Sequence, residues 1–152
     1  MLKEGNLAPD FELTSNNGEK VKLSNFKGRF VVLYFYPRAM TAGCTREGLR
    51  FNELYDDFKK LNVEILGVST DSVDKIKKFS ERYGFKFKLL SDAEGYVVGL
   101  YGVKKDSTSL AAERTTFIID PNGIIVKILK NIRPAEKHAD QSLEELKKII
   151  NK

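Results

Sequence analysis

The sequence predicts an α/β protein, in which a mixed central sheet has helices on both faces and is preceded by an N-terminal β-hairpin. Three observations lead to this fold class. In the middle of the chain, short apolar runs alternate with segments of helical apolar periodicity, as parallel βαβ units do. Before them, an alternating segment surrounds an Asn-Gly turn. After them come a second strand pair and a final amphipathic helix.

The first part of the chain is predicted to hold a hairpin and a buried strand. Residues 11–14 and 21–23 alternate in polarity around a turn signal at 15–18, which predicts the hairpin. A short connection leads to the run from Phe30 to Tyr36, which is apolar or aromatic throughout and ends at Pro37. Such a run is typical of a strand buried on both faces, and we expect it to be the central strand of the sheet.

The middle of the chain is predicted to continue as helix, strand, helix and strand. An apolar stripe at i, i+3, i+4 and i+7 predicts a helix from about Cys44 to Lys60. The next predicted elements are a buried strand at 63–69, a helix from a cap at Asp71 or Ser72 to Tyr83, and an extended stretch at 87–90.

The last part of the chain is predicted to hold a hairpin between two helices. Its elements are a short helix at 97–101, strands at 115–119 and 124–129 joined by a turn, and a helix that begins at Ser142. A thioredoxin-like architecture is the simplest match to parallel units followed by a hairpin and a terminal helix. Because no linker or internal repeat is found, we expect one domain over residues 1–152.

The composition is that of an ordinary globular protein. Of the 152 residues, 41% are hydrophobic and 31% are charged, and a chain of this length can bury a core without disulfides or metals. The N-terminus lacks the apolar stretch of a signal peptide, and no apolar run approaches the roughly 18 residues that span a bilayer. We therefore expect a soluble, cytoplasmic protein with no membrane partner.

The charge balance is basic, with a net charge of +5 and an isoelectric point near 9.2. Such a balance can indicate an anionic partner such as nucleic acid. Basic residues mostly alternate with acidic ones, however, as in residues 74–82, which is typical of a solvated helix face. We therefore expect no nucleic-acid partner.

The chain has a single cysteine, Cys44. It is a buried apolar filler, a reactive thiol or half of an intermolecular link. Its position favours reactivity, because it follows the carboxyl end of the predicted central strand, where open α/β sheets place their ligand sites. It also falls in the first turn of the predicted helix, where unpaired N–H groups and the helix dipole stabilise a thiolate.

Two neighbours of Cys44 have a chemical and a structural interpretation each. Thr41 stands three residues before Cys44, so its hydroxyl could point at the sulfur and hold an incoming oxygen, or it could be an N-cap. Pro37 ends the strand and could shield the thiolate from water, or it could be a strand terminator alone.

The pattern Pro37-x-x-x-Thr41-x-x-Cys44 directly after an aromatic strand resembles the active-site motif of peroxiredoxins. The resemblance covers nearly all of the chain and is strongest to the Q-type subgroup, also called bacterioferritin comigratory proteins. Its further segments are residues 5–11, 67–71 and 117–123. It implies a thioredoxin-like peroxidase, in which the Cys44 thiolate attacks a hydroperoxide and becomes a sulfenic acid.

The resemblance also implies three further site features. Arg114 matches an arginine of the peroxide pocket, where it would stabilise negative charge, and Glu47 resembles a carboxylate that orients this arginine. From the helix pattern alone, an exposed glutamate is the favoured interpretation of Glu47. Leu49 stands where many relatives carry a resolving cysteine, which leaves a one-cysteine cycle. An external thiol, from a thioredoxin-like protein or a small molecule, would then resolve Cys44 in a monomer or homodimer.

Other classes of function fit less well. A disulfide reductase of the same fold needs a C-x-x-C pair, which one cysteine cannot provide. A non-enzymatic binding module and a single-use peroxide sensor remain as alternatives. The only histidine, His138, is expected at the surface without a metal, and no phosphate loop or calcium loop occurs. No metal or cofactor is therefore expected.

Overall fold

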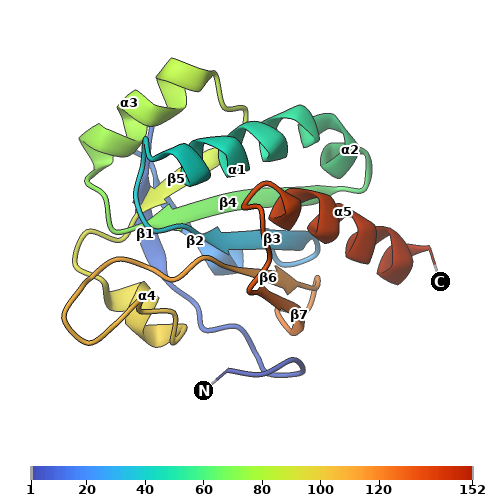
Figure 1. The fold of residues 1–152 in the computed structure, drawn as a ribbon. Coiled ribbons are helices and arrows are strands. Elements are labelled where there is room, and N and C mark those ends of the chain that lie inside the picture. The colour runs from blue at the N-terminus through green and yellow to red at the C-terminus, as the bar shows by residue number, and fades with distance from the viewer. Residues whose placement is uncertain (1, 152) are drawn as a thin grey trace.

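A computed structural model describes residues 2–151, which form one seven-stranded sheet with helices on both faces (Figure 1). The strands are β1 (Glu12–Ser15), β2 (Lys20–Lys22), β3 (Phe30–Phe35), β4 (Val63–Ser69), β5 (Lys88–Ser91), β6 (Thr115–Ile119) and β7 (Ile125–Lys130). The helices are α1 (Ala42–Glu53), α2 (Tyr55–Lys60), α3 (Val73–Tyr83), α4 (Tyr96–Leu100) and α5 (Lys137–Ile150), with a 3-10 turn η1 at Leu23–Phe26.

The strand order is β2-β1-β5-β4-β3-β6-β7. Strands β3, β4 and β5 are parallel neighbours, whereas β6 and β7 pair antiparallel next to β3. The N-terminal hairpin is antiparallel, with Leu13 opposite Val21. The α/β fold class, both hairpins and the parallel units are therefore confirmed. The expectation that the strand after Phe30 is central is wrong, because β4 has three strands on either side and β3 lies next to it.

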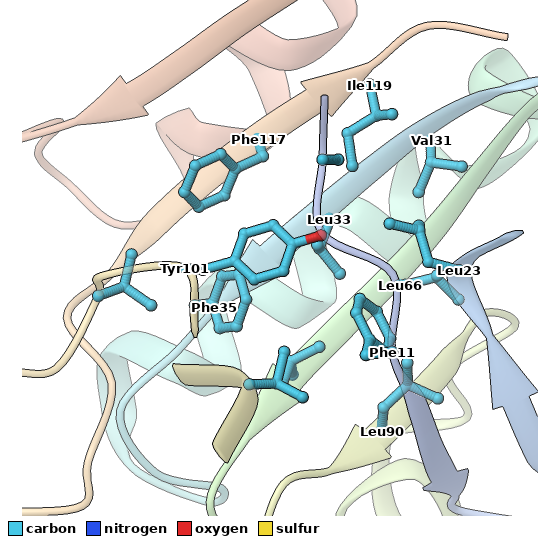
Figure 2. Packing of buried hydrophobic residues seen from close by; sticks show 14 of the residues in the cluster. Phe11, Leu23, Val31, Leu33, Phe35, Leu66, Leu90, Tyr101, Phe117 and Ile119 are labelled. Carbon is cyan, nitrogen blue, oxygen red and sulfur yellow. The ribbon is translucent and has the colours of Figure 1, made fainter. Parts of the chain in front are cut away.

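Strand β3 is buried on both faces of the sheet, as its continuous apolar run predicts. Leu33 and Phe35 face a core that also contains residues of α4, whereas Val32 and Tyr34 face a second core under α1, α2, α3 and α5. Figure 2 shows the first core, in which the Phe35 ring packs against Phe117 at a centroid distance of 5.8 Å. Full burial of each such side chain contributes roughly 1.5–3 kcal/mol to the free energy of folding.

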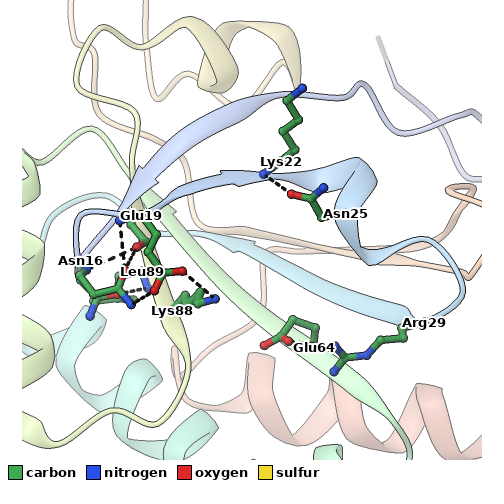
Figure 3. A network of polar contacts seen from close by, with 10 residues as sticks. Asn16, Glu19, Lys22, Asn25, Arg29, Glu64, Lys88 and Leu89 are labelled. Carbon is green, nitrogen blue, oxygen red and sulfur yellow. Dashed lines mark hydrogen bonds and ion pairs between the residues drawn. The ribbon is translucent and has the colours of Figure 1, made fainter.

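The N-terminal hairpin is attached to the edge of the parallel strands by side-chain contacts (Figure 3). The Asn16 side-chain oxygen accepts a hydrogen bond from the Leu89 N–H at 2.9 Å, and Glu19 pairs with Lys88 at 3.8 Å. At the lower right of the same figure, Arg29 pairs with Glu64 at 3.3 Å. This second ion pair joins the starts of β3 and β4.

Two predicted helix boundaries need correction. The helix expected over residues 44–60 is divided at Leu54, whose backbone has φ −91° and ψ 2°. Phe51 in α1 and Phe58 in α2, on the two sides of this division, are both fully buried. The last helix begins at Lys137 rather than at Ser142. Its first turns carry no apolar stripe in the sequence, but they are held by polar contacts with α1 and β6.

Among residues 2–151, none of the helices is long and apolar enough to cross a membrane.

Candidate active site

Cys44 lies in the first turn of α1, at the carboxyl end of β3. Its side chain is buried, with 2% of its surface exposed. The first N–H groups of a helix have no partner within the helix, and they carry the positive end of the helix dipole. The sulfur of Cys44 is therefore held where a negative charge is stabilised.

The loop between β3 and α1 is anchored to the end of β4. The N–H of Ala39 donates a hydrogen bond to Asp71 at 2.6 Å, and the Ser69 hydroxyl donates to the same carboxylate oxygen at 2.8 Å. Met40, which follows Ala39 in this loop, has a left-handed backbone with φ 67°. A non-glycine residue at such an angle is strained, and the Asp71 contacts hold the loop in this shape. These contacts fix where α1 begins.

Arg114 joins Cys44 to Glu47. It precedes β6, which pairs with β3, and its guanidinium reaches two acceptors on α1. Its Nη2 is 3.5 Å from Cys44 Sγ, and its Nη1 donates to Glu47 Oε1 at 2.5 Å. Glu47 is fully buried, so the alternative of an exposed helix glutamate is wrong. It is buried because it lies one turn beyond Cys44 on the face of α1 that packs toward the sheet.

Glu47 and Arg114 each shift the pKa of the other. Burial raises the pKa of Glu47 to about 8, although the positive charge of Arg114 lowers it. Its other oxygen, Oε2, is buried and has no hydrogen-bond partner among the described residues. Burial lowers the pKa of Arg114, but Glu47 and Cys44 raise it more, so the net direction is upward. The guanidinium therefore stays positive beside the sulfur.

Gly43 is a part of the site that the sequence patterns did not reveal. A Cβ atom at this position would lie 3.1 Å from Arg114 Nη2, which is tighter than ordinary van der Waals contact. The missing side chain leaves the guanidinium room to approach Cys44. No periodicity could have revealed this, because the approaching residue is 71 positions away in the chain.

Thr41 and Pro37 lie in the segment that leads to Cys44, and both line a pocket of about 280 Å³. Its other lining residues are Arg38, Lys105, Asp106, Ser109 and Ala111. Thr41 occupies the N-cap position of α1, but its side chain caps no N–H group. Its hydroxyl donates instead to the Arg38 carbonyl at 2.9 Å. The hydroxyl can therefore reach the pocket above α1 only by rotating away from this bond.

His138 is buried, with 1% of its surface exposed, so the prediction of a surface histidine is wrong. The reason is the earlier start of α5, which places residue 138 against the sheet. Its Nδ1 is 2.9 Å from the Thr116 hydroxyl oxygen. Burial and the charge of Arg114 lower the pKa of His138 to about 4, so the imidazole is neutral at pH 7. A second histidine or a motif would have been needed to single it out from sequence.

Within residues 2–151, no group of three or more histidine, cysteine, aspartate or glutamate side chains is arranged to hold a metal ion. The site combines a buried sulfur at a helix N-terminus, a cation that contacts it, and a carboxyl group that holds the cation. Such an arrangement stabilises a thiolate and the negative charge that develops when sulfur attacks an electrophile.

Known proteins are similar to this chain over nearly its whole length. A sequence model of the AhpC/TSA family matches residues 5–128. Peroxiredoxin Bcp of Bacillus subtilis is 39% identical, with 99% of this chain and 99% of that protein covered. Chloroplastic peroxiredoxin Q of Sedum lineare is 38% identical over 97% of this chain and 80% of that protein.

Solved structures agree with the sequence comparisons. Peroxidoxin BcpB of Mycobacterium tuberculosis superposes with a TM-score of 0.91 at 38% identity, covering 98% of this chain and 99% of that one. The bacterioferritin comigratory protein of Xanthomonas campestris, studied for its alkyl peroxide reduction activity, gives a TM-score of 0.86 at 36% identity, with 92% of each chain covered. By sequence and by fold, the chain therefore belongs to the AhpC/TSA family and, within it, to the peroxiredoxins of the Bcp and Q type.

Proposed function

We propose that the protein is a thiol-dependent peroxidase that reduces hydrogen peroxide and alkyl hydroperoxides, with Cys44 as the nucleophile. The observation that carries this proposal is the 3.5 Å contact between Cys44 Sγ and Arg114 Nη2 at the N-terminus of α1. A structural cysteine has no need of a half-buried cation beside its sulfur. The alkyl peroxide reduction activity named for the Xanthomonas relative supports the substrate class.

In the first step, the Cys44 thiolate attacks the terminal oxygen of the peroxide. A sulfur–oxygen bond forms while the oxygen–oxygen bond breaks, and the leaving oxygen takes a proton to become water or an alcohol. Cys44 is left as a sulfenic acid. Arg114 stabilises the thiolate and then the leaving oxygen, and its planar guanidinium serves both because Glu47 holds it from the other side.

The remaining site residues have supporting roles in this proposal. Glu47 orients Arg114 rather than touching the peroxide, since it is fully buried. Thr41 supplies a hydroxyl to the incoming oxygen once it leaves the Arg38 carbonyl. Pro37 lines the same pocket without offering an N–H group, and it keeps water away from the sulfur.

The second step needs a thiol from outside the chain, because Cys44 is the only cysteine. A thiol attacks the sulfenic sulfur, water leaves, and a mixed disulfide forms. A second thiol then releases the Cys44 thiolate and a disulfide product. We propose a thioredoxin-like protein or a small thiol as the reductant in this one-cysteine cycle.

The proposal is tested by intact mass after one equivalent of hydrogen peroxide, with and without an added thiol. We expect the mass of one oxygen to be added and then removed by thiol, with repeated peroxide consumption when thiol is in excess. Cys44→Ser should abolish both results, because an alcohol is far less ionised and less nucleophilic. Thr45→Ser, a change in the same helical turn that spares the sulfur, is the matched control.

Turnover by Cys44→Ser near the wild-type rate would contradict the proposal. Oxidation without any turnover, whichever thiol is offered, would instead favour a single-use sensor. The cytoplasmic location, the monomeric or homodimeric state and the lack of a nucleic-acid partner stay predictions from sequence.

A further inference from the structure

The Thr116–His138 pair is a buried polar contact that the proposed chemistry does not use. It joins β6 to α5, and both side chains are at most 1% exposed. The second ring nitrogen of His138, Nε2, has no partner among the described residues. A buried imidazole with one unpaired nitrogen lowers stability, so its presence in the contact between α5 and the sheet calls for a function.

The pair lies next to the reacting groups. Side chains two positions apart in a strand project to the same face, so Thr116 shares its face with Arg114. The Cys44 side chain belongs to the core on that face, together with Ile118. Arg114 and His138 also line one pocket of about 240 Å³, together with Ala135 and residues 131–133. His138 and Arg114 therefore border the same pocket, which Cys44 and Glu47 do not line.

Helix α5 is attached to both elements that carry the site. On one side, His138 contacts Thr116 of β6. On the other side, Asp140 accepts hydrogen bonds from Arg50 of α1 at 2.7 and 3.0 Å. Since Cys44 and Glu47 lie on α1 and Arg114 lies just before β6, the first turns of α5 set the position of one element relative to the other.

His138 is uncharged at pH 7, which is compatible with a position in the same pocket as the Arg114 cation. Burial and the nearby cation keep His138 neutral at pH 7. Of the groups around it, Thr116 on β6 is neutral, and Glu113 and Arg133 in the pocket have opposite charges. A neutral group that hydrogen-bonds to the strand can therefore pack close to Arg114 without competing with it for Glu47 or Cys44.

We propose that His138 is a positioning residue of the peroxidatic site: its hydrogen bond to Thr116 holds the start of β6 so that Arg114 reaches Cys44 and Glu47 together. The proposal rests on the proposed peroxidase function. Because small displacements of a reacting group are costly, loss of the bond should slow Cys44 oxidation roughly tenfold or more.

The test breaks the bond from each side. His138→Leu removes the imidazole, Thr116→Val removes the hydroxyl, and the double variant removes both. We expect each single variant to slow Cys44 oxidation by peroxide and to reduce the ultraviolet absorbance of the thiolate at neutral pH. The double variant should be no slower than the slower single one, because both changes remove one interaction. His138→Asn, which keeps a polar atom near the Nδ1 position, should restore part of the rate.

Leu146→Ala on the same helix is the control for general destabilisation, since Leu146 is fully buried and belongs to the apolar face of α5. It should lower the melting temperature without changing the oxidation rate or the thiolate absorbance. If the bond-breaking variants behave like Leu146→Ala, or if their effects add in the double variant, the positioning role is overturned. If His138→Leu does not fold, the oxidation rates of Thr116→Val and His138→Asn still test the positioning role. A wild-type rate for Thr116→Val would overturn it.

The two proposals fail in different ways. A wild-type protein that consumes no peroxide contradicts the peroxidase function. The thiolate absorbance of the same variants still reports whether the Thr116 bond holds Arg114 beside Cys44. Normal wild-type turnover with unchanged variants contradicts the positioning role alone.

Discussion

Replacing Arg114 by lysine separates the charge of this side chain from its shape. The guanidinium places one nitrogen on Glu47 at 2.5 Å and the other 3.5 Å from Cys44 Sγ. A lysine keeps the positive charge on a single nitrogen, which cannot occupy both places. Because one nitrogen must then serve both acceptors, we expect the ammonium group to lie farther from the sulfur than the guanidinium does.

The expected loss of rate follows from the distance between the positive charge and Cys44 Sγ. With an effective dielectric constant of about 20, opposite charges 3.5 Å apart attract by about 4.7 kcal/mol. At about 5 Å the attraction falls to about 3.3 kcal/mol. If this difference of about 1.4 kcal/mol is lost from the transition state, Arg114→Lys slows the peroxidatic step roughly tenfold. Arg114→Ala loses the cation and the donor, and it should slow the step roughly a hundredfold to a thousandfold, as loss of an oxyanion donor does.

The assay must follow Cys44 itself, because the chain has no tryptophan to report the reaction by fluorescence. Quenched-flow samples analysed by intact mass give the oxidised fraction against time at several peroxide concentrations. Arg82→Lys and Arg82→Ala are matched controls, since Arg82 is an exposed arginine on α3, away from the site. Equal rates for Arg114→Ala and wild type would refute the assigned pocket. A lysine variant as slow as the alanine variant would refute the distance argument.

Four further results are expected. Gly43→Ala should slow Cys44 oxidation roughly tenfold in stopped or quenched flow, because its Cβ displaces Arg114 Nη2; a rate equal to wild type would show that the guanidinium is free to move. The rate should fall, roughly tenfold, as pH rises through about 8, where Glu47 ionises and opposes the negative charge at the sulfur, and Glu47→Gln should remove this decline; superimposable pH profiles would contradict it. In urea unfolding, wild type should lose roughly 3 kcal/mol more than His138→Asn between pH 6.5 and about 4, because unfolded His138 gains a proton that the folded state excludes; parallel stability curves would be the contrary result. Peroxide without thiol should add oxygen to Cys44, which dimedone traps, with no loss of two hydrogens within a monomer; a monomer two hydrogens lighter would overturn the one-cysteine cycle.

Local patterns were sufficient for most of the fold. The run from Phe30 onward reports burial on both faces, and the boundaries 63–69 and 115–119 agree with β4 and β6. These elements were predictable because burial repeats along the chain with the period of the element itself. The start of α5 was not predictable in this way, since His138 and Asp140 are held by partners on β6 and α1 rather than by an apolar stripe.

By itself, the sequence determined the α/β class, the position of Cys44 in the first turn of a helix after a buried strand, and the peroxiredoxin motif that includes Pro37 and Thr41. These are local features, set by residues within a few positions of one another. The resemblance implied that Arg114 and Glu47 belong to the site, but only the tertiary structure gave their contacts with each other and with Cys44, and only it showed that His138 is buried. Those contacts join residues that are up to 70 positions apart. They depend on strand pairing and helix packing, which bring distant side chains together without leaving a periodic signal in the sequence.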